Sequence, residues 1–563
     1  MSAEPSAGVR EPRVAAWHLA MLAAFVAGMA LRAWQLDIQI LIDDEWHAIH
    51  KLLRSGPGDI LTHLGYADYS IPLTLYYQGL YRTIGLSEWG MHLPALVAGI
   101  GLLIVGSRLL AGWATLPTRA IWLALTAISP LLVYHSKVAR PYALTSLLTF
   151  VAIVAFRAWW LRGRRRDAAI YSAATFLAGW LHPITLPFTL LPFAYCGALA
   201  AGRAAKSAGR GDAAPHVERV RRLFVLGVAT VVPLATVLGP PIVIDWAQFT
   251  AKANKDTVTL ESAYRTLLML AGTGSPIVGG AVWACVAFGF GRLLRRDADL
   301  AGYVAAVLGI GSVAVASSGA EWISHPLVLA RYLIPALPFV LLLAADGLAG
   351  IVERLRRPPL EAAGAMALAV GLLFAGPIPR EWHYPNQFWG HLRYQFDYDP
   401  AHNPYVQLVP NDPVPAFYRE LAKLPPASVT LIEAPWRLES HFNPLSLYQD
   451  VHRQLVKIGL VTPVCGVLDF GEYPEERSGM KMRELVHLTS ILRGDAHGAD
   501  YLVLHVKPRN MAADPGASWP DMTRCMPAIA ERLGPPAYRD DQVVVYKLAG
   551  LSPLGNTRRP VQQ

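Results

Sequence analysis

The sequence predicts a polytopic α-helical membrane protein with an α/β domain at its C-terminal end. Of its 563 residues, 53% are hydrophobic and only 16% are charged, whereas roughly a quarter are charged in a typical soluble domain. Up to Pro377 the apolar residues form runs of about 20 with almost no charge, the length that a helix needs to cross a bilayer core. After Pro377, short strand-like and helical segments alternate. This composition excludes a disordered chain, a collagen and a small disulfide scaffold.

Eleven apolar runs are candidate membrane spans, so residues 1–378 are predicted to form a membrane module and residues 379–563 a separate domain. The runs lie near 14–34, 91–111, 117–135, 142–161, 168–182, 184–202, 223–245, 276–294, 299–318, 332–351 and 360–378. The fifth run is short, and only the His182-Pro183 turn separates it from the sixth. These two runs therefore predict either two spans or a pair of half-buried helices.

Lys and Arg are unevenly distributed between the two alternating sets of loops. One set contains 21 of these residues and the other contains 10. Because Lys and Arg accumulate in short cytoplasmic loops, the N-terminus is predicted to be cytoplasmic and, after eleven spans, residues 379–563 are predicted to lie outside. The net charge of +9 has the same origin, so membrane lipids are expected partners and nucleic acid is not. The first run ends in Leu31-Arg32-Ala33-Trp34 without a small-residue cleavage site, so no cleaved signal peptide is predicted.

The first outer loop, residues 35–90, is too long for a simple turn. Residues 45–54 place Trp46, Ile49, Leu52 and Leu53 on one helical face, which predicts an amphipathic helix lying on the outer membrane surface. Residues 68–83 predict a second such helix.

Residues 379–563 show the alternation of an α/β domain with a mainly parallel sheet. Strands are predicted at 429–433, 456–464, 501–506 and 543–547, and helices at 444–455 and 481–493. Neither a G-x-G-x-x-G motif nor a P-loop is present, so no nucleotide cofactor is expected. Cys465 and Cys525 both fall in this domain, but their spacing does not decide whether they form a disulfide. We expect no acid–base group at the strand ends. The domain is therefore expected to help select a substrate, the acceptor of the reaction inferred below, and not to carry out the reaction itself.

Three consecutive acids, Asp43-Asp44-Glu45, lie just outside the first span. Carboxylates beside a membrane are costly unless they bind something. One interpretation is that Asp43 or Asp44 caps the helix that begins at Glu45. The other is that one of them is a catalytic base, with the neighbouring acids assisting it or holding a divalent ion. His47 and His50 follow closely, so the sequence leaves metal dependence open.

Cationic and aromatic residues gather at the outer ends of later spans. Lys137, Arg140 and Arg331 are either interfacial anchors or partners of a phosphate, for which Arg offers a bidentate fork. His182 is either a packed, hydrogen-bonded residue or a ligand. The set of candidate phosphate-binding and substrate-lining residues is Lys137, Arg140, Arg331, Tyr142, His182 and Tyr332.

The Asp397-Tyr398-Asp399 segment has the D-x-D form that binds metal and nucleotide in another glycosyltransferase fold. No apolar strand precedes it, and it lies among Pro and Asn residues, so the sequence favours a loop or sugar-binding role over a metal site.

The order of these motifs resembles that of the GT-C superfamily of membrane glycosyltransferases, in the group of bacterial aminoarabinose transferases and protein O-mannosyltransferases. The similarity covers most of residues 14–351 and comprises Asp44-Glu45, Arg140-Pro141-Tyr142, His182 and the Arg331-Tyr332-Leu-Ile-Pro335 run. It implies that Asp44 is the catalytic carboxylate, with Asp43 as close competitor. It also implies a multi-pass protein of the bacterial inner membrane with a periplasmic C-terminal domain. Many relatives have an acid where this chain has Val138.

An active site on the outer side has no supply of nucleotide sugars. The expected donor is therefore a polyprenyl-phosphate sugar, and the expected reaction is inverting transfer to a hydroxyl of an envelope glycan, lipid or protein. A carboxylate would remove the hydroxyl proton, and cations would stabilise the departing lipid phosphate. The alternatives are a lipid or polysaccharide transporter, which favours polar residues at mid-membrane, and a non-enzymatic envelope scaffold.

Overall fold

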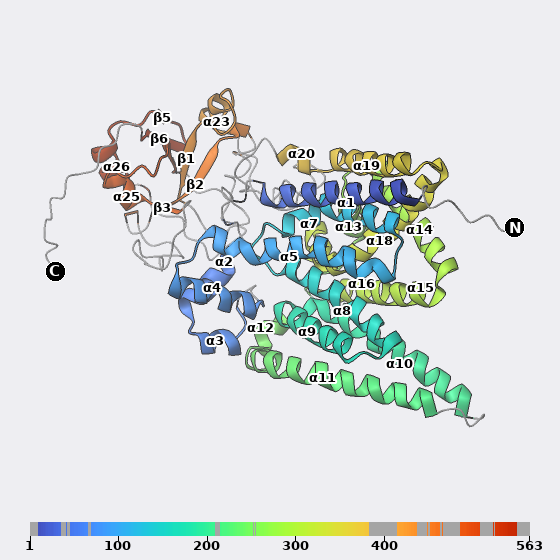
Figure 1. Cartoon of the computed structure of the whole chain (residues 1–563). Helices are drawn as coiled ribbons and strands as arrows, with labels where there is room; N and C mark the ends of the chain where they lie inside the picture. The colour runs from blue at the N-terminus through green and yellow to red at the C-terminus, as the bar shows by residue number, and fades with distance from the viewer. Residues whose placement is uncertain are drawn as a thin grey trace.

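The computed structural model describes residues 10–34, 36, 41, 45–65, 69–208, 214–251, 253, 255–381, 414–435, 448, 451–461, 464–465, 485–506, 522 and 524–548. The chain forms a helical part, from α1 (Arg10–Ala33) to α20 (Ile378–Glu381), and a C-terminal part built on one sheet. Figure 1 shows the two parts side by side, with the sheet at one end of the helical part.

Within the described ranges, eight helical stretches are long and apolar enough to cross a membrane. They are α1, α5 (Glu88–Leu109) with η3 (Leu110–Gly112), α8 (Tyr142–Arg162), η4 (Pro183–Thr185) with α10 (Leu186–Ala208), α11 (Ala214–Ile244), α14 (Pro276–Arg296), α15 (Ala298–Ala305) with η5 (Ala306–Ile310) and α16 (Gly311–Ala316), and α17 (Pro326–Leu333) with η6 (Ile334–Ala336), α18 (Leu337–Val352) and η7 (Glu353–Leu355).

The other three predicted spans are shorter helices. They are α6 (Leu116–Ile128) with α7 (Pro130–His135), α9 (Arg165–Leu181) and α19 (Pro358–Ala375). The segment between α11 and α14 contains α12 (Trp246–Ala251) and α13 (Leu260–Ala271). Each of the eleven predicted runs thus falls on a helix, and the chain is a multi-pass membrane protein.

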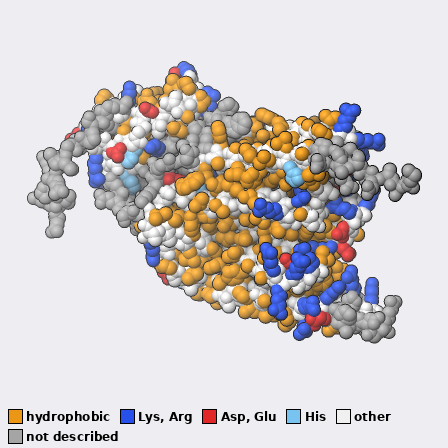
Figure 2. All heavy atoms as spheres, viewed as in Figure 1, with side chains coloured by type: hydrophobic (Ala, Val, Ile, Leu, Met, Phe, Trp, Pro, Cys, Tyr) orange, Lys and Arg blue, Asp and Glu red, His pale blue; other side chains and the backbone are white. Residues whose placement is uncertain are grey.

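The two ends of the helical part differ in charge. In Figure 1, α1 starts near the N-terminus at the right, and the helices that follow it lie at the left beside the sheet. Figure 2 shows hydrophobic side chains across the visible face of the helical part, with Lys and Arg gathered at the right-hand end. Arg221 and Arg222 at the start of α11 are among the exposed residues of this kind.

The first outer loop folds into α2 (Trp46–Arg54), α3 (Pro57–Thr62) and α4 (Ile71–Thr83), as helices were predicted at 45–54 and 68–83. The predicted membrane-facing orientation of the first helix is wrong. Ile49 and Leu52 are buried and belong to one apolar cluster with Ile60, Ile71 and Tyr77. The apolar face of α2 is therefore covered by protein, which satisfies it as well as a lipid surface would.

A buried arginine completes the carboxyl end of α6. In a continuous helix the carbonyl of Thr126 would accept a hydrogen bond from the N–H of residue 130. Residue 130 is a proline, which has no N–H. The side chain of Arg32, at the end of α1, donates instead to the carbonyls of Thr126 at 3.1 Å and Ala127 at 3.0 Å. Unsatisfied carbonyls are costly in a bilayer, so Arg32 is a structural residue.

Helices α14 and α18 touch through glycines. A Cβ atom on Gly289 would lie 1.9 Å from the Leu343 carbonyl oxygen, and one on Gly347 would lie 2.1 Å from the Cys285 carbonyl oxygen. Small residues allow the close backbone approach that holds membrane helices together. Near this contact the buried carboxylate of Asp346 pairs with Arg292 at 3.2 Å and Arg296 at 3.4 Å.

The C-terminal part contains a six-stranded sheet in the order β3-β2-β1-β4-β6-β5. The strands are β1 (Thr430–Ala434), β2 (Leu455–Leu460), β3 (Leu485–His487), β4 (Tyr501–His505), β5 (Tyr538–Arg539) and β6 (Val543–Lys547), and the described helices are α23 (Ala416–Leu421), α25 (Leu488–Leu492) and α26 (Met526–Leu533). Strands β1 to β4 are parallel to one another. Strand β6 is antiparallel to both of its neighbours, β4 and β5. The prediction of a mainly parallel sheet is confirmed.

Two helix predictions in this domain need comment. The helix predicted at 481–493 is wrong in part, because Leu485–His487 pair with Ile458–Leu460 as a strand. Among the described residues 485–493, only α25 is helical. Half of the helix predicted at 444–455, residues 444–447 and 449–450, lies outside the described residues, as does the Asp397-Tyr398-Asp399 segment.

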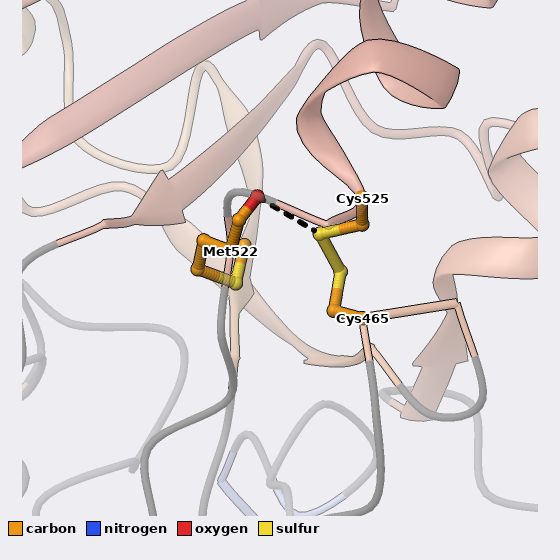
Figure 3. The surroundings of a disulfide bond; sticks show 3 residues. All are labelled: Cys465, Met522 and Cys525. Atoms are coloured by element: carbon orange, nitrogen blue, oxygen red, sulfur yellow. Dashed lines mark hydrogen bonds between the residues drawn. A yellow bond between two sulfur atoms is a disulfide. The ribbon is translucent and has the colours of Figure 1, made fainter.

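Cys465 and Cys525 form the disulfide that the sequence left open, with 2.03 Å between the sulfur atoms (Figure 3). The bond connects the segment after β2 to the start of α26, and the Cys525 Sγ also lies 3.5 Å from the Met522 carbonyl oxygen. Both cysteines are buried in the same apolar cluster.

Candidate functional site

Five side chains lie together where four helices begin or end. They are His135 at the end of α7, Tyr142 at the start of α8, His182 after α9, and Arg331 and Tyr332 in α17. The Arg331 guanidinium carbon lies 5.6 Å from the centre of the Tyr142 ring and 5.4 Å from that of Tyr332. The His182 ring lies 5.7 Å from Tyr142 and 5.8 Å from Tyr332. Arg331 and His182 thus contact the same two tyrosines.

Prolines fix where these helices begin. Pro183 opens η4 and Pro326 opens α17, positions that proline favours because its missing N–H is not needed there. In both cases the preceding histidine caps the helix: the Nδ1 atoms of His182 and His325 accept the N–H groups of Ile184 and Leu327. His182 is therefore hydrogen-bonded as the first interpretation of the sequence expected, and it also faces the two tyrosines.

Two arginines influence the pKa of His182. Burial, together with the positive charges of Arg140 and Arg331, lowers the pKa of His182 to about 3. The ring is therefore neutral near pH 7 and carries its proton on Nε2, because Nδ1 accepts a hydrogen bond. Both guanidinium groups contribute to this lowered pKa.

Lys137 and Arg140 lie in the loop between α7 and α8, and their side chains are only 2% and 8% exposed. Lysine and arginine are seldom buried this far without an anionic or hydrogen-bonding partner. Together with Arg331, they give this region three positive charges next to a neutral histidine. Such a region is suited to bind an anion.

Glu45 directly precedes α2 and is fully buried. Its carboxylate accepts the backbone N–H of Ala139 and lies 2.9 Å from the Nε2 atom of His92 in α5. Asp43 and Asp44 lie outside the described residues. No three His, Cys, Asp or Glu side chains of the described ranges, which omit both of these acids, are grouped so as to hold a metal ion.

The expectation of no acid–base group at the strand ends is wrong. Glu433 at the end of β1 lies 2.7 Å from the Nε2 atom of His505 at the end of β4, and the Tyr418 hydroxyl donates to Glu433 at 2.9 Å. Because β1 and β4 are adjacent parallel strands, their carboxyl ends bring these polar residues together. All three side chains are at least 93% buried, so the group is a closed network that holds α23 on the sheet. The sequence signal is a single polar residue at the end of each apolar strand.

No family model and no curated protein matches this chain. Among solved structures it is similar to ArnT from Cupriavidus metallidurans bound to undecaprenyl phosphate, with 14% identity, coverage of 95% of this chain and 98% of that one, and a TM-score of 0.46. The apo structure of ArnT gives 15% identity, coverage of 94% and 97%, and a TM-score of 0.44.

The oligosaccharyltransferase of Archaeoglobus fulgidus, in its apo form, gives 12% identity, coverage of 87% of this chain and 70% of that one, and a TM-score of 0.39. ArnT and this enzyme are members of the GT-C superfamily, the group that the sequence resembles. At these identities and TM-scores, the function has to be argued from the residues of this chain.

Proposed function

We propose that this chain is an integral membrane glycosyltransferase that moves a sugar from a polyprenyl-phosphate-linked donor to an acceptor hydroxyl on the outer face of the membrane. The observation that supports it best is the contact of Arg331 with the rings of Tyr142 and Tyr332. Together with Arg331, Arg140 lowers the pKa of His182 beside these rings. Aromatic rings attract a guanidinium through its face, whereas its N–H groups donate in its plane. Arg331 lies beside two aromatic rings, and in our proposal its N–H groups make a bidentate contact with an anion.

A lipid phosphate at the outer surface fits these charges. Arg140, Arg331 and Lys137 would bind the phosphate of the donor, and Tyr142, His182 and Tyr332 would line the sugar and phosphate. As the bond between the sugar and the phosphate breaks, negative charge grows on the departing phosphate. Cations that are already in place stabilise this charge without reorganisation.

The first-loop acids would supply the base. In our proposal Asp44, or Asp43 as the competing candidate, takes the proton of the acceptor hydroxyl while its oxygen attacks the anomeric carbon. The bond from that carbon to the phosphate oxygen breaks on the opposite face, so the configuration inverts and the polyprenyl phosphate leaves as an anion. Asp44 precedes Glu45, whose carboxylate contacts Ala139 next to Arg140.

Arg331→Ala is expected to weaken binding of undecaprenyl phosphate about tenfold or more. A charge-assisted contact contributes roughly 1.5–3 kcal/mol, and about 1.4 kcal/mol is a factor of ten. The measurement is titration of purified full-length protein with this lipid, together with release of lipid phosphate from a panel of polyprenyl-phosphate sugars. Adding a chelator to the release assay tests whether a divalent ion takes part.

The matched control is Arg82→Ala, which removes an exposed arginine at the end of α4. Unchanged binding in both Arg331→Ala and Arg140→Ala would exclude the phosphate site. A wild-type protein that binds none of these lipids would contradict the donor class and favour a transporter.

The proposal requires the cluster to face the outside, with the N-terminus in the cytoplasm of a bacterial inner membrane and the C-terminal domain in the periplasm. We expect a cysteine introduced beside Arg164, between α8 and α9, to react with a membrane-impermeant reagent only after the membrane is opened. A cysteine at the exposed Arg82 position should react in intact cells. The reverse pattern would place the cluster on the wrong side for a lipid-linked donor.

A further inference from the structure

The backbone of Ala139 is held on both sides of its Cα atom by the first outer loop. Its N–H, in the Val138–Ala139 peptide, donates to the carboxylate of Glu45, the residue before α2. Its carbonyl oxygen, in the Ala139–Arg140 peptide, accepts the hydroxyl of Tyr77 in α4 at 3.1 Å. Ala139 itself is 3% exposed and belongs to the apolar cluster of α2 and α4. The two hydrogen bonds hold two successive peptide groups, one on each side of Ala139.

The two groups that hold Ala139 are themselves fixed by α5. The Glu45 oxygen that accepts from Ala139 is also 2.9 Å from the Nε2 atom of His92, and the Tyr77 hydroxyl is 3.4 Å from the carbonyl oxygen of Met91. Glu45 and His92 are both fully buried. Three helices, α2, α4 and α5, therefore meet at one residue of the loop between α7 and α8.

Ala139 directly precedes Arg140. The orientation of the Ala139–Arg140 peptide, whose carbonyl Tyr77 binds, determines where the Arg140 side chain starts. The loop is also tight on this side, because the Arg140 N–H donates to the carbonyl of Val138 at 2.7 Å. We infer that Glu45 and Tyr77 are positioning residues for Arg140, an inference that rests on the proposed function. Glu45 then acts through its hydrogen bonds, and neither as a second base nor as a metal ligand.

The three roles for Glu45 differ in what a glutamine would do. A positioning residue needs an oxygen that accepts from Ala139 and His92, and the amide oxygen of glutamine accepts as well. A base or a metal ligand needs the negative charge. Glu45→Gln should therefore keep most of the activity if Glu45 positions the loop, and lose it as Glu45→Ala does if the charge is required.

The test uses full-length protein and the variants Glu45→Gln, Glu45→Ala and Tyr77→Phe. Tyr76→Phe is the matched control, because Tyr76 is the neighbour of Tyr77 in α4 and its hydroxyl donates to Gly90, away from the loop. The first measurement is hydrogen exchange of residues 136–141 without lipid. The second is the affinity for undecaprenyl phosphate.

We expect faster exchange at 136–141 and about tenfold weaker lipid binding, the loss of one charge-assisted contact, in Glu45→Ala and Tyr77→Phe. Glu45→Gln and Tyr76→Phe should stay close to wild type in both measurements. Unchanged exchange in Tyr77→Phe and Glu45→Ala would overturn the inference. So would a Glu45→Gln protein that binds undecaprenyl phosphate normally but no longer releases lipid phosphate from a polyprenyl-phosphate sugar. If the wild type does not bind the lipid, the proposed function fails, while the exchange data alone still decide whether Glu45 and Tyr77 hold the loop.

Discussion

Asp44→Asn is expected to lower sugar transfer by about 10²–10⁴-fold, the usual cost of losing a general base, and to leave binding of undecaprenyl phosphate near the wild-type value. Asparagine keeps the size and hydrogen-bonding capacity of aspartate but cannot take the hydroxyl proton at neutral pH. In the proposed mechanism Asp44 does not bind the phosphate, so the loss should appear in turnover and not in lipid affinity. Single-turnover release of lipid phosphate measures the first, and lipid titration measures the second.

Asp43→Asn is the matched comparison, because it removes an identical carboxylate one residue earlier. If the large loss occurs in Asp43→Asn and not in Asp44→Asn, the base is Asp43. A folded Asp44→Asn protein with full release, alongside an equally active Asp43→Asn protein, would remove both acids from the reaction and leave the hydroxyl proton without an acceptor in this loop.

Gly289→Leu is expected to abolish the folded protein, or to lower its thermal midpoint severely. A Cβ atom at this position would lie 1.9 Å from the Leu343 carbonyl oxygen and 2.8 Å from the Gly347 amide nitrogen. These are backbone atoms, so no rotamer change relieves the clash and α14 must move away from α18. Overpacking commonly costs about 1–3 kcal/mol, and a clash between backbones belongs above that range.

The control is Gly291→Leu, two residues further along α14, where an added Cβ meets no atom within 4 Å. We expect its yield and thermal midpoint in detergent to match the wild type. Equal behaviour of the two variants would contradict the close crossing of α14 and α18. Since α18 continues from α17 through η6, a shift of α18 would also displace the turn that contains Arg331.

The sequence predicted the helices of the membrane part because long apolar runs have few alternative structures in a bilayer. It did not predict what covers the amphipathic α2, since a hydrophobic face is satisfied equally by lipid and by protein. Here Ile49 and Leu52 are covered by protein. Similarly, β3 is a strand only because β2 lies beside it, and pairing with a distant segment leaves no local pattern.

The candidate site shows the same division. Charges and aromatic residues at span ends identified Tyr142, His182 and Arg331, and the structure brings these three into contact. They also identified Arg140, whose charge helps to lower the pKa of His182. The buried network of Glu433 and His505 was missed, because the adjacency of β1 and β4 depends on a strand order that local spacing does not reveal. The hydrogen bonds of Glu45 and Tyr77 with the backbone of Ala139 were missed for the same reason.

The buried guanidinium of Arg32 has a consequence for how the protein is made. Its acceptor carbonyl at Thr126 is synthesised 94 residues later, so at about 5–20 residues per second α1 waits roughly 5–20 seconds for α6. During that time a charged group at the end of α1 has no partner in the nascent chain's later helices, and a charge in the bilayer is costly. We expect α1 to remain beside the insertion machinery until α6 emerges, and to leave early when Arg32 is replaced by leucine. Crosslinking of ribosome-bound chains stalled before and after Thr126 would show whether the release of the first helix into the lipid is timed by the third predicted span.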